Sequence, residues 1–318
     1  MIQLVTGAAG FIGCHLVASL VARGHDVIAF DNLSRGNTSY LAGPIASGRC
    51  KFVEVDCADF ANLLPAAHAV LGVGRAGALW HMAANSDISA GVADPNVDLR
   101  DTFMTTFNTL LLMRELEIPD FRFASSSAIY GDLGDVEIRE DTAFCRPISN
   151  YGAMKLASEA QINAALHAFG HSATIFRFPN VVGAPATHGV IYDFICRLTL
   201  DAQRLLVLGD GTQQKLYMHV SDLIDAMHFI VERVSEKVAI YNIGPMDKGA
   251  TVRSIAEYVR DSVAPEATIV YGTGNRGWVG DVPRFNYSVE RLTALGWKPS
   301  MGSTDAIRQA VFDIINSA

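Results

Sequence analysis

Tyr151 and Lys155 are the two side chains of this sequence whose types and spacing best suit acid–base chemistry. They stand four residues apart in a stretch, 150–169, whose periodicity predicts a helix, so both lie on one face of it. A phenol can take and return a proton, and a nearby positive charge favours its ionised form. Any helix can carry such a pair by chance. The pair gains weight from a run of three serines, 125–127, that ends a predicted strand upstream.

A glycine-rich turn at the start of the chain supplies a second chemical signal. The segment Gly7-Ala8-Ala9-Gly10-Phe11-Ile12-Gly13 stands between a short β-rich run, 2–6, and an amphipathic stretch, 11–22. Glycine lets backbone N–H groups approach a pyrophosphate at the beginning of a helix. A lone glycine triplet is a weak signal, and a plain helix cap would also explain it. Its place between a strand and a helix predicts dinucleotide binding.

Acidic residues that end the next two predicted strands are placed to meet the adenosine half of a dinucleotide. Asp31 stands 18 residues after Gly13, close to the offset at which a carboxylate binds ribose hydroxyls. A carboxylate there repels a 2′-phosphate and favours NAD over NADP, although Arg35 nearby is of the type that accepts this phosphate. Asp56-Cys57 follows the third strand and is placed to meet the adenine. A simple turn carboxylate explains Asp56 almost equally well.

The elements that must hold these groups alternate along the first half of the chain. Short β-rich runs are separated by helical stretches, clearest at 96–117 and 150–169. This alternation predicts a doubly wound parallel α/β sheet that is covered on both faces. The carboxyl ends of its strands would bring the glycine turn, the acidic residues and the serines to one edge.

After residue 178 the alternation stops, and prolines and glycines crowd together. We therefore predict a smaller, discontinuous α/β domain for substrate. The predicted nucleotide-binding domain comprises 1–178 with about 219–245, and the predicted substrate domain comprises 179–218 with 246–318.

Composition excludes several classes of protein. Half of the 318 residues are hydrophobic and 18% are charged, which does not fit a disordered protein. A net charge of −8 argues against nucleic acid or an anionic membrane as the main partner. No apolar run approaches the ~18 residues of a spanning helix, and the N-terminus lacks the basic segment of a signal peptide. The five cysteines follow no metal or disulfide spacing. We expect a cytoplasmic enzyme without a metal site.

Six segments together resemble one enzyme family. They are the glycine turn, Asp31-Asn32-Leu33-Ser34-Arg35-Gly36, His81-Met82-Ala83-Ala84, Phe123-Ala124-Ser125-Ser126-Ser127-Ala128-Ile129-Tyr130-Gly131, Tyr151-x-x-x-Lys155 and Arg177-Phe178-Pro179-Asn180. Over nearly its whole length the chain is similar to the extended short-chain dehydrogenases/reductases, and among them to the NAD-dependent epimerase/dehydratase family. The resemblance implies a Rossmann domain that binds NAD and a second domain that binds a UDP-sugar. It also implies a homodimer formed through helices 96–117 and 150–169.

The resemblance assigns roles to individual residues. The catalytic residues would be Ser126, Tyr151 and Lys155, with Ser125 and Ser127 as neighbouring candidates for the serine. The cofactor would be bound by Gly7, Gly10, Phe11, Ile12, Asp31, Asn32, Ser34, Asp56, Cys57, Met82, Ala83, Ala84, Ser125, Tyr151, Lys155, Phe178 and Asn180. The substrate would be bound by Ser126, Ser127, Tyr151, Asn180, Lys215, Tyr217, Arg276, Asp281 and Phe285. One departure is Thr102, which stands where the family usually has an asparagine.

The residues that follow Ser126 favour one reaction of the family over others. Dehydratases that resemble this chain carry Thr-Asp-Glu where it has Ser126-Ser127-Ala128, and two small residues cannot supply the acid and base of an elimination. Related decarboxylases usually keep a glutamate at the position of Ala128. What remains is reversible oxidation at one carbinol carbon. The resemblance thus implies an NAD-dependent sugar-nucleotide 4-epimerase that interconverts UDP-hexoses through a 4-keto intermediate, with Tyr151 as acid and base.

Two other functions stay open, and one residue bears on the sugar. An NAD(P)-dependent sugar-nucleotide reductase or dehydrogenase would share the motifs but release its cofactor. A non-catalytic nucleotide-sensing protein would more often have lost Tyr151 or Lys155. Phe285 falls where the resemblance places a residue beside the sugar pocket, and a large aromatic ring leaves little room for an N-acetyl group. We expect UDP-glucose or UDP-galactose, or a compact uronate or pentose, to be preferred over UDP-N-acetylglucosamine.

Overall fold

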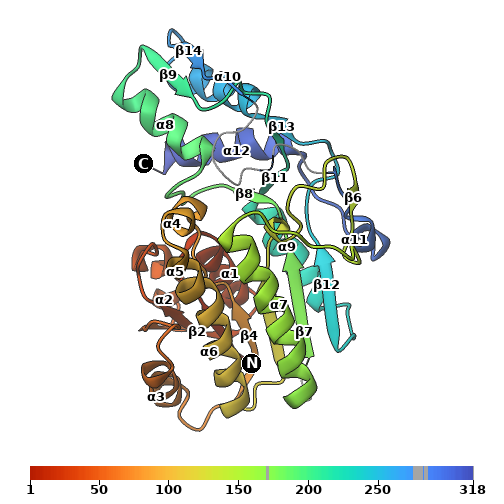
Figure 1. Cartoon of the computed structure of the whole chain (residues 1–318). Helices are drawn as coiled ribbons and strands as arrows, with labels where there is room; N and C mark the ends of the chain where they lie inside the picture. The colour runs from red at the N-terminus through yellow and green to blue at the C-terminus, as the bar shows by residue number, and fades with distance from the viewer. Residues whose placement is uncertain (170–171, 275–281, 283–285, 318) are drawn as a thin grey trace. The chain divides into compact units, whose positions relative to one another are not determined.

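The computed structural model describes residues 1–169, 172–274, 282 and 286–317 (Figure 1). The chain folds into two compact units, each assembled from several segments. The first unit comprises Met1–Ile129, Ser149–Arg177 and Ile230–Tyr241, and the second comprises Tyr130–Ile148, Phe178–Phe229 and Asn242–Ala318.

The first unit is built on a seven-stranded sheet of order β12-β7-β5-β4-β1-β2-β3 (Figure 1). Its strands are β1 (Ile2–Thr6), β2 (Asp26–Asp31), β3 (Cys50–Glu54), β4 (Ala76–His81), β5 (Asp120–Ala124), β7 (Ser172–Arg177) and β12 (Val238–Asn242). The pairings among β1, β2, β3, β4, β5 and β7 are all parallel. The central strands are buried almost throughout, as parallel strands covered on both faces must be. The predicted doubly wound α/β sheet is confirmed.

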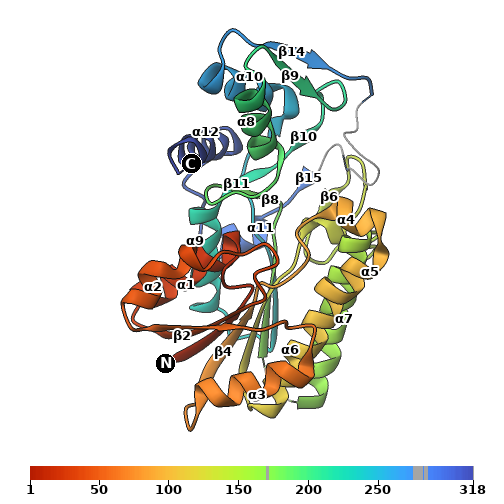
Figure 2. The same cartoon turned by 90° about the vertical axis from the view of Figure 1, so that its left-hand side faces the viewer.

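Helices cover both faces of this sheet. They are α1 (Phe11–Ala22), η1 (Thr38–Leu41), α2 (Ala42–Ala46), α3 (Phe60–Leu71), α4 (Ile88–Ala93), α5 (Pro95–Asp98), the π-helical η2 (Leu99–Met104), α6 (Thr105–Glu115), the short 3₁₀ turn η3 (Ser127–Ile129) and α7 (Asn150–Phe169). Figure 2 shows α3, α6 and α7 on one side of the sheet and α1 on the other. Apolar side chains of α3, α6 and α7 form one core with those of the strands.

The helix predicted over 96–117 is interrupted by a wider turn. It consists of α5, the π-helical η2 and α6 in direct succession. Hydroxyls just after the wide turn bond back to its carbonyls: Thr105 Oγ1 donates to Asp101 O at 3.1 Å, and Thr106 Oγ1 donates to Thr102 O at 3.0 Å. Such back-bonding competes with the regular helical ladder and accompanies bends in helices. The bulge places Thr102, the departure noted in the sequence, inside the wide turn.

The strand order reverses at β1, which lies between β2 and β4. Chains leaving β1 and β4 turn to opposite sides, and ligands of doubly wound sheets bind outside the carboxyl ends at such a point. Gly7 directly follows β1 and Met82 directly follows β4. Asp31 ends β2, and Ser125 follows β5.

The second unit has its own core and several short sheets. Its strands pair two by two as β6 (Glu137–Ile138) with β15 (Asn286–Tyr287), β8 (Asn180–Val182) with β11 (Tyr217–His219), β9 (Arg204–Val207) with β14 (Thr268–Tyr271), and β10 (Gln214–Lys215) with β13 (Ala250–Thr251). Its helices are α8 (Val190–Leu200), α10 (Val252–Val263), α11 (Glu290–Ala294) and α12 (Ser303–Asn316), and α9 (Val220–Val231) continues into the first unit. Apolar residues of α8, α10 and α12 enclose the core.

Candidate active site

The glycine turn brings three chain segments closer together than side chains would allow. Gly7 has a φ of +64°, and a Cβ there would lie 2.6 Å from the backbone nitrogen of Ala83. A Cβ on Gly13 would lie 2.0 Å from Gly7 O. Gly10 precedes α1, and no side chain caps the N–H groups that begin this helix. The turn therefore presents open backbone donors beside the carboxyl ends of β1 and β4, which fits a pyrophosphate.

Asp31 fastens the glycine turn to the end of β2. Its Oδ2 accepts from Ala9 N at 2.9 Å, and its Oδ1 accepts from Leu33 N at 2.8 Å. Each carboxylate oxygen has further lone-pair capacity, so both can still accept from ribose hydroxyls. Burial raises the pKa of Asp31 above its usual value. Arg35 pairs with Asp87 at 2.8 Å, so its guanidinium faces a carboxylate within the chain.

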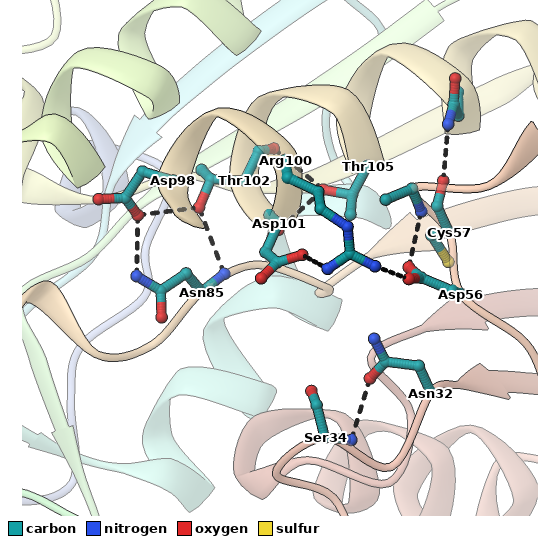
Figure 3. A network of polar contacts seen from close by, with 12 residues as sticks. Asn32, Ser34, Asp56, Cys57, Asn85, Asp98, Arg100, Asp101, Thr102 and Thr105 are labelled. Atoms are coloured by element: carbon teal, nitrogen blue, oxygen red, sulfur yellow. Dashed lines mark hydrogen bonds and ion pairs between the residues drawn. The ribbon is translucent and has the colours of Figure 1, made fainter. Parts of the chain in front are cut away.

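Asp56, predicted to meet the adenine, is held by a residue that sequence reasoning missed. Figure 3 shows Arg100 of η2 between Asp56 and Asp101, contacting both carboxylates. Ala58 N also donates to Asp56 Oδ1 at 2.9 Å, and Asn108 Nδ2 donates to Cys57 O at 3.0 Å. Arg100 belongs to no sequence motif, and it lies 44 residues from Asp56 in the chain. In the same view Ser34 N donates to Asn32 Oδ1 at 3.1 Å.

The loop after β4 is tied down on both sides. Met82 N donates to Thr6 O at 3.1 Å, which holds Met82 and Ala83 beside the glycine turn; Ala84 follows them. Asn85, also missed from the sequence, donates its backbone N–H to Thr102 Oγ1 at 3.2 Å (Figure 3). Asn85 Nδ2 donates to Asp98 Oδ1 at 2.9 Å. Thr102 thus holds this loop through its hydroxyl.

Ser126, Tyr151 and Lys155 come together between the end of β5 and the first turns of α7. Ser126 hydrogen-bonds to Tyr151 through its side chain. Lys155 is 2% exposed, and its Nζ donates to Ala124 O at 2.6 Å. The Nζ also lies 5.8 Å from the ring centroid of Tyr151. This arrangement places a proton-bearing phenol beside a hydroxyl and an amine, as acid–base chemistry requires.

Burial dominates the proton equilibria of the tyrosine and the lysine. It raises the pKa of Tyr151 to about 12, against the hydrogen bond from Ser126, and the Asp98 carboxylate raises it further. Burial lowers the pKa of Lys155 to about 7, although the carboxylates of Glu159 and Asp98 oppose this.

Ser125 makes a different contact from Ser126. Ser125 is 1% exposed and donates its hydroxyl proton to Glu159 Oε1, on α7. Arg177, the last residue of β7, donates to both oxygens of Glu159 at 3.0 and 2.6 Å. Ser127 is 7% exposed and begins η3. The Glu159–Arg177 pair had no counterpart in the sequence analysis.

The predicted substrate residues that the structure describes outside β5 and α7 lie in the second unit. Asn180 and Tyr217 are directly paired in the register of β8 and β11, and Asn180 Nδ2 donates to Leu216 O at 3.1 Å. Lys215 lies in β10, two residues before Tyr217. Phe178 is buried at the start of this unit's second segment. Arg276, Asp281 and Phe285 lie outside the described residues.

Three further features of the described residues concern metal binding, membrane insertion and the state of the cysteines. Their histidines, cysteines and acidic residues form no group that could hold a metal ion. None of their helices has the length and apolarity needed to cross a membrane. The five cysteines all lie in the described part of the chain and form no disulfide bond, and burial raises the pKa of the Cys14 and Cys57 thiols to about 11 and about 12.

Residues 3–244 match the model of the NAD dependent epimerase/dehydratase family. The chain belongs to this family. A UDP-glucose 4-epimerase of Corynebacterium glutamicum is 31% identical over 81% of this chain and 79% of its own. The crystal structure of Thermus thermophilus UDP-glucose 4-epimerase in complex with NAD is 29% identical, with a TM-score of 0.84 over the full length of both chains. The UDP-glucose 4-epimerase of Thermotoga maritima with UDP-glucose is 26% identical, with a TM-score of 0.86 over 100% and 99% of the two chains. The family is NAD-dependent, which confirms the cofactor predicted from the sequence.

Proposed function

We propose that this chain is an NAD-dependent 4-epimerase of UDP-hexoses. The observation that carries the proposal is the contact of Ser126 with Tyr151, one helical turn before the buried Lys155. The side chains of Ser126, Tyr151 and Lys155 lie at the same sheet edge as the glycine turn. The chain is a member of an NAD-dependent family. The similarity to UDP-glucose 4-epimerases over most of the chain supports the choice of reaction. Ser127 and Ala128 add no acid or base that an elimination would need.

In this proposal Tyr151 removes the proton of the sugar's 4-hydroxyl group and later returns it. Ser126 donates a hydrogen bond to the same oxygen and orients it. Lys155, when protonated, supplies the positive charge that stabilises the phenolate against the burial that raises its pKa. Bound NAD supplies the reversible oxidation at C4. Because the protein lowers the pKa of Lys155 to about 7, the charge state of this lysine changes near neutral pH.

The first unit would bind NAD and the second the nucleotide sugar. The bounds differ from the predicted ranges, 1–178 with 219–245 and 179–218 with 246–318, because the second unit also contains Tyr130–Ile148, residues 219–229 and residues 242–245. The glycine turn and its neighbours Phe11 and Ile12 would take the pyrophosphate. Asp31 would bind the ribose hydroxyls, and the Asp56–Arg100 pair would border the adenine. The close approach of Ala83 to Gly7 supports a tight phosphate site there.

Asn180, Lys215 and Tyr217 would contact the UDP-sugar together with Arg276, Asp281 and Phe285. The placement of the first three in neighbouring short strands of one unit supports this grouping. We further propose a cytoplasmic homodimer that forms through α5–α6 and α7. Phe103, Phe107 and Leu111 are each partly exposed on these helices, which supports such an interface.

The test is a panel of UDP-sugars incubated with purified protein and NAD, with the products separated by chromatography. We expect UDP-glucose and UDP-galactose to interconvert, and UDP-N-acetylglucosamine to react more slowly. Protein purified without added cofactor should carry NAD. A net reduced product that consumes free NADH or NADPH would favour the reductase, and binding without any product would favour a nucleotide sensor.

A further inference from the structure

The end of β5 is fastened to α7 at three successive residues. Lys155 Nζ donates to Ala124 O, Ser125 Oγ donates to Glu159, and Ser126 hydrogen-bonds to Tyr151. Positions 151, 155 and 159 are spaced one turn apart on α7, so they form one row that faces the strand end. The outer two strand contacts serve the groups of the proposed mechanism. The middle contact, from Ser125 to Glu159, has no part in it.

Glu159 cannot turn away from Ser125, because a second charged group holds it. Arg177 donates to both of its oxygens, and the two side chains are each 7% exposed. A bidentate guanidinium fixes the plane of a carboxylate, and a buried pair of this kind is costly to separate. Arg177 ends β7, which pairs with β5 in the sheet. The pair therefore anchors Ser125 to two neighbouring elements.

We propose that Ser125 is a positioning residue: held by the Glu159–Arg177 pair, it fixes the end of β5 against the catalytic row of α7. This inference rests on the proposed epimerase function. It gives Ser125 a different role from the cofactor contact predicted from the sequence. The side chain is 1% exposed and donates its only proton to Glu159, so it has no donor left for a ligand.

Glu159 of this pair also acts on the charge of Lys155. Among the described residues, the ionisable groups beside this lysine or acting on it are Tyr151 and Glu159 on α7, Asp98 on α5 and His81 on β4. Arg177 on β7 is paired with Glu159. Burial and the charge of Lys155 hold the pKa of His81 well below its usual value, so this ring is neutral. Glu159 and Asp98 raise the pKa of Lys155 against its burial. Removing the charge of Glu159 should therefore make Lys155 lose its proton at lower pH.

Steady-state kinetics of Ser125→Ala and Ser158→Ala test the positioning role. Ser158 is the matched control, since it is 0% exposed, lies next to Glu159 on α7, and donates its hydroxyl to Thr106 Oγ1 at 3.1 Å. Ser125→Ala should lower kcat by about 10- to 100-fold through misplacement, with KM and NAD affinity unchanged. Ser158→Ala should keep the wild-type kcat. Weaker NAD binding by Ser125→Ala with an unchanged kcat would overturn the proposal and restore the cofactor contact.

A second measurement does not depend on turnover. The variant is Glu159→Gln, which keeps the shape of the side chain and removes its charge. Nuclear magnetic resonance of ¹³C-lysine-labelled protein should show Lys155 titrating at lower pH in this variant, and at the wild-type pH in Ser158→Ala. An unchanged titration in folded Glu159→Gln overturns the role of this carboxylate. If the titration shifts while the wild type converts no UDP-sugar, the proposed function fails and the anchoring stands.

Discussion

Two regions along the same sheet edge, the β5–α7 end and the β2–β3 end, both pair carboxylates with arginines. The pairs differ in how far they are exposed to solvent. At the β5–α7 end, Glu159 and Arg177 pair with both side chains 7% exposed, and Lys155 is equally enclosed. At the β2–β3 end, Asp56 pairs with an Arg100 whose side chain is 58% exposed, and Arg35 and Asp87 are similarly open. Buried pairs hold geometry rigidly, whereas exposed pairs contribute little to stability and are screened by salt.

The difference suggests a division of work along the edge. Where proton transfer is proposed, the side chains are held by buried charged groups. Where the adenosine half of NAD is proposed to lie, the Asp56–Arg100 and Arg35–Asp87 pairs are exposed to solvent, and Asp31 is the buried carboxylate beside them. The following predictions ask whether effects of substitution follow this contrast.

The largest effect is expected from Tyr151→Phe, at the buried end. Loss of one acid–base group costs about 10²–10⁴-fold in turnover. NAD affinity should stay near the wild-type value, because phosphate binding depends on the glycine turn. Initial rates and NAD titration of the same preparation measure both quantities. A variant that keeps the wild-type rate would remove Tyr151 from the mechanism.

Glu159→Gln should show how strongly the buried pair holds the first unit. It removes the charge of the carboxylate to which Arg177 donates two hydrogen bonds in a buried setting, and breaking a buried pair by removing one partner costs about 3–5 kcal/mol of unfolding free energy. Urea unfolding followed by circular dichroism measures the change. A loss well below 1 kcal/mol would mean that water reaches this pair, and the contrast between the two ends would then fail.

Asp31→Asn should have an intermediate effect at the other end. The amide keeps one acceptor oxygen but loses the negative charge that faces Ala9 N and the expected ribose. Hydrogen bonds to a charged group contribute about 1.5–3 kcal/mol, so NAD affinity should fall about tenfold or more. The preference for NAD over NADP should fall as well, because the carboxylate that repels a 2′-phosphate is gone. Equal weakening of both cofactors would place their discrimination elsewhere.

The smallest effect is expected from Arg100→Gln. Its pair with Asp56 is exposed, so the loss of unfolding free energy should stay below about 1 kcal/mol and vanish at high salt. Urea unfolding at low and high salt provides the measurement, with Glu159→Gln as the buried counterpart. A salt-independent loss as large as that of Glu159→Gln would contradict the account of this end.

Much of this site could be predicted from the sequence, because the alternation of strands and helices and the spacing of the motif residues can be read from neighbouring positions in the chain. The alternation of strands and helices predicts a parallel sheet, and the strand pairings confirm it. The four-residue spacing predicts that Tyr151 and Lys155 share one face of α7, which begins at Asn150 as predicted. The glycine turn could be placed for the same reason. Each of these signals is local in the chain.

The contacts that escaped prediction join residues far apart in sequence. Arg100 and Asp56 lie 44 residues apart in the chain, and the pattern of 96–117 gave no sign of the π-helical η2 to which Arg100 belongs. Glu159 and Arg177 are of types that are rarely buried, and their pairing depends on the packing of α7 on β7.

The central claim, reversible oxidation at C4 of a UDP-hexose, is tested most directly with UDP-galactose deuterated at C4. Wild-type protein with NAD is incubated with this sugar, and products are followed by nuclear magnetic resonance and mass spectrometry. We predict UDP-glucose that keeps deuterium at C4, because the same hydrogen leaves and returns within one turnover. A 4-keto-6-deoxy product, loss of the deuterium to solvent, or no conversion at all would contradict the account.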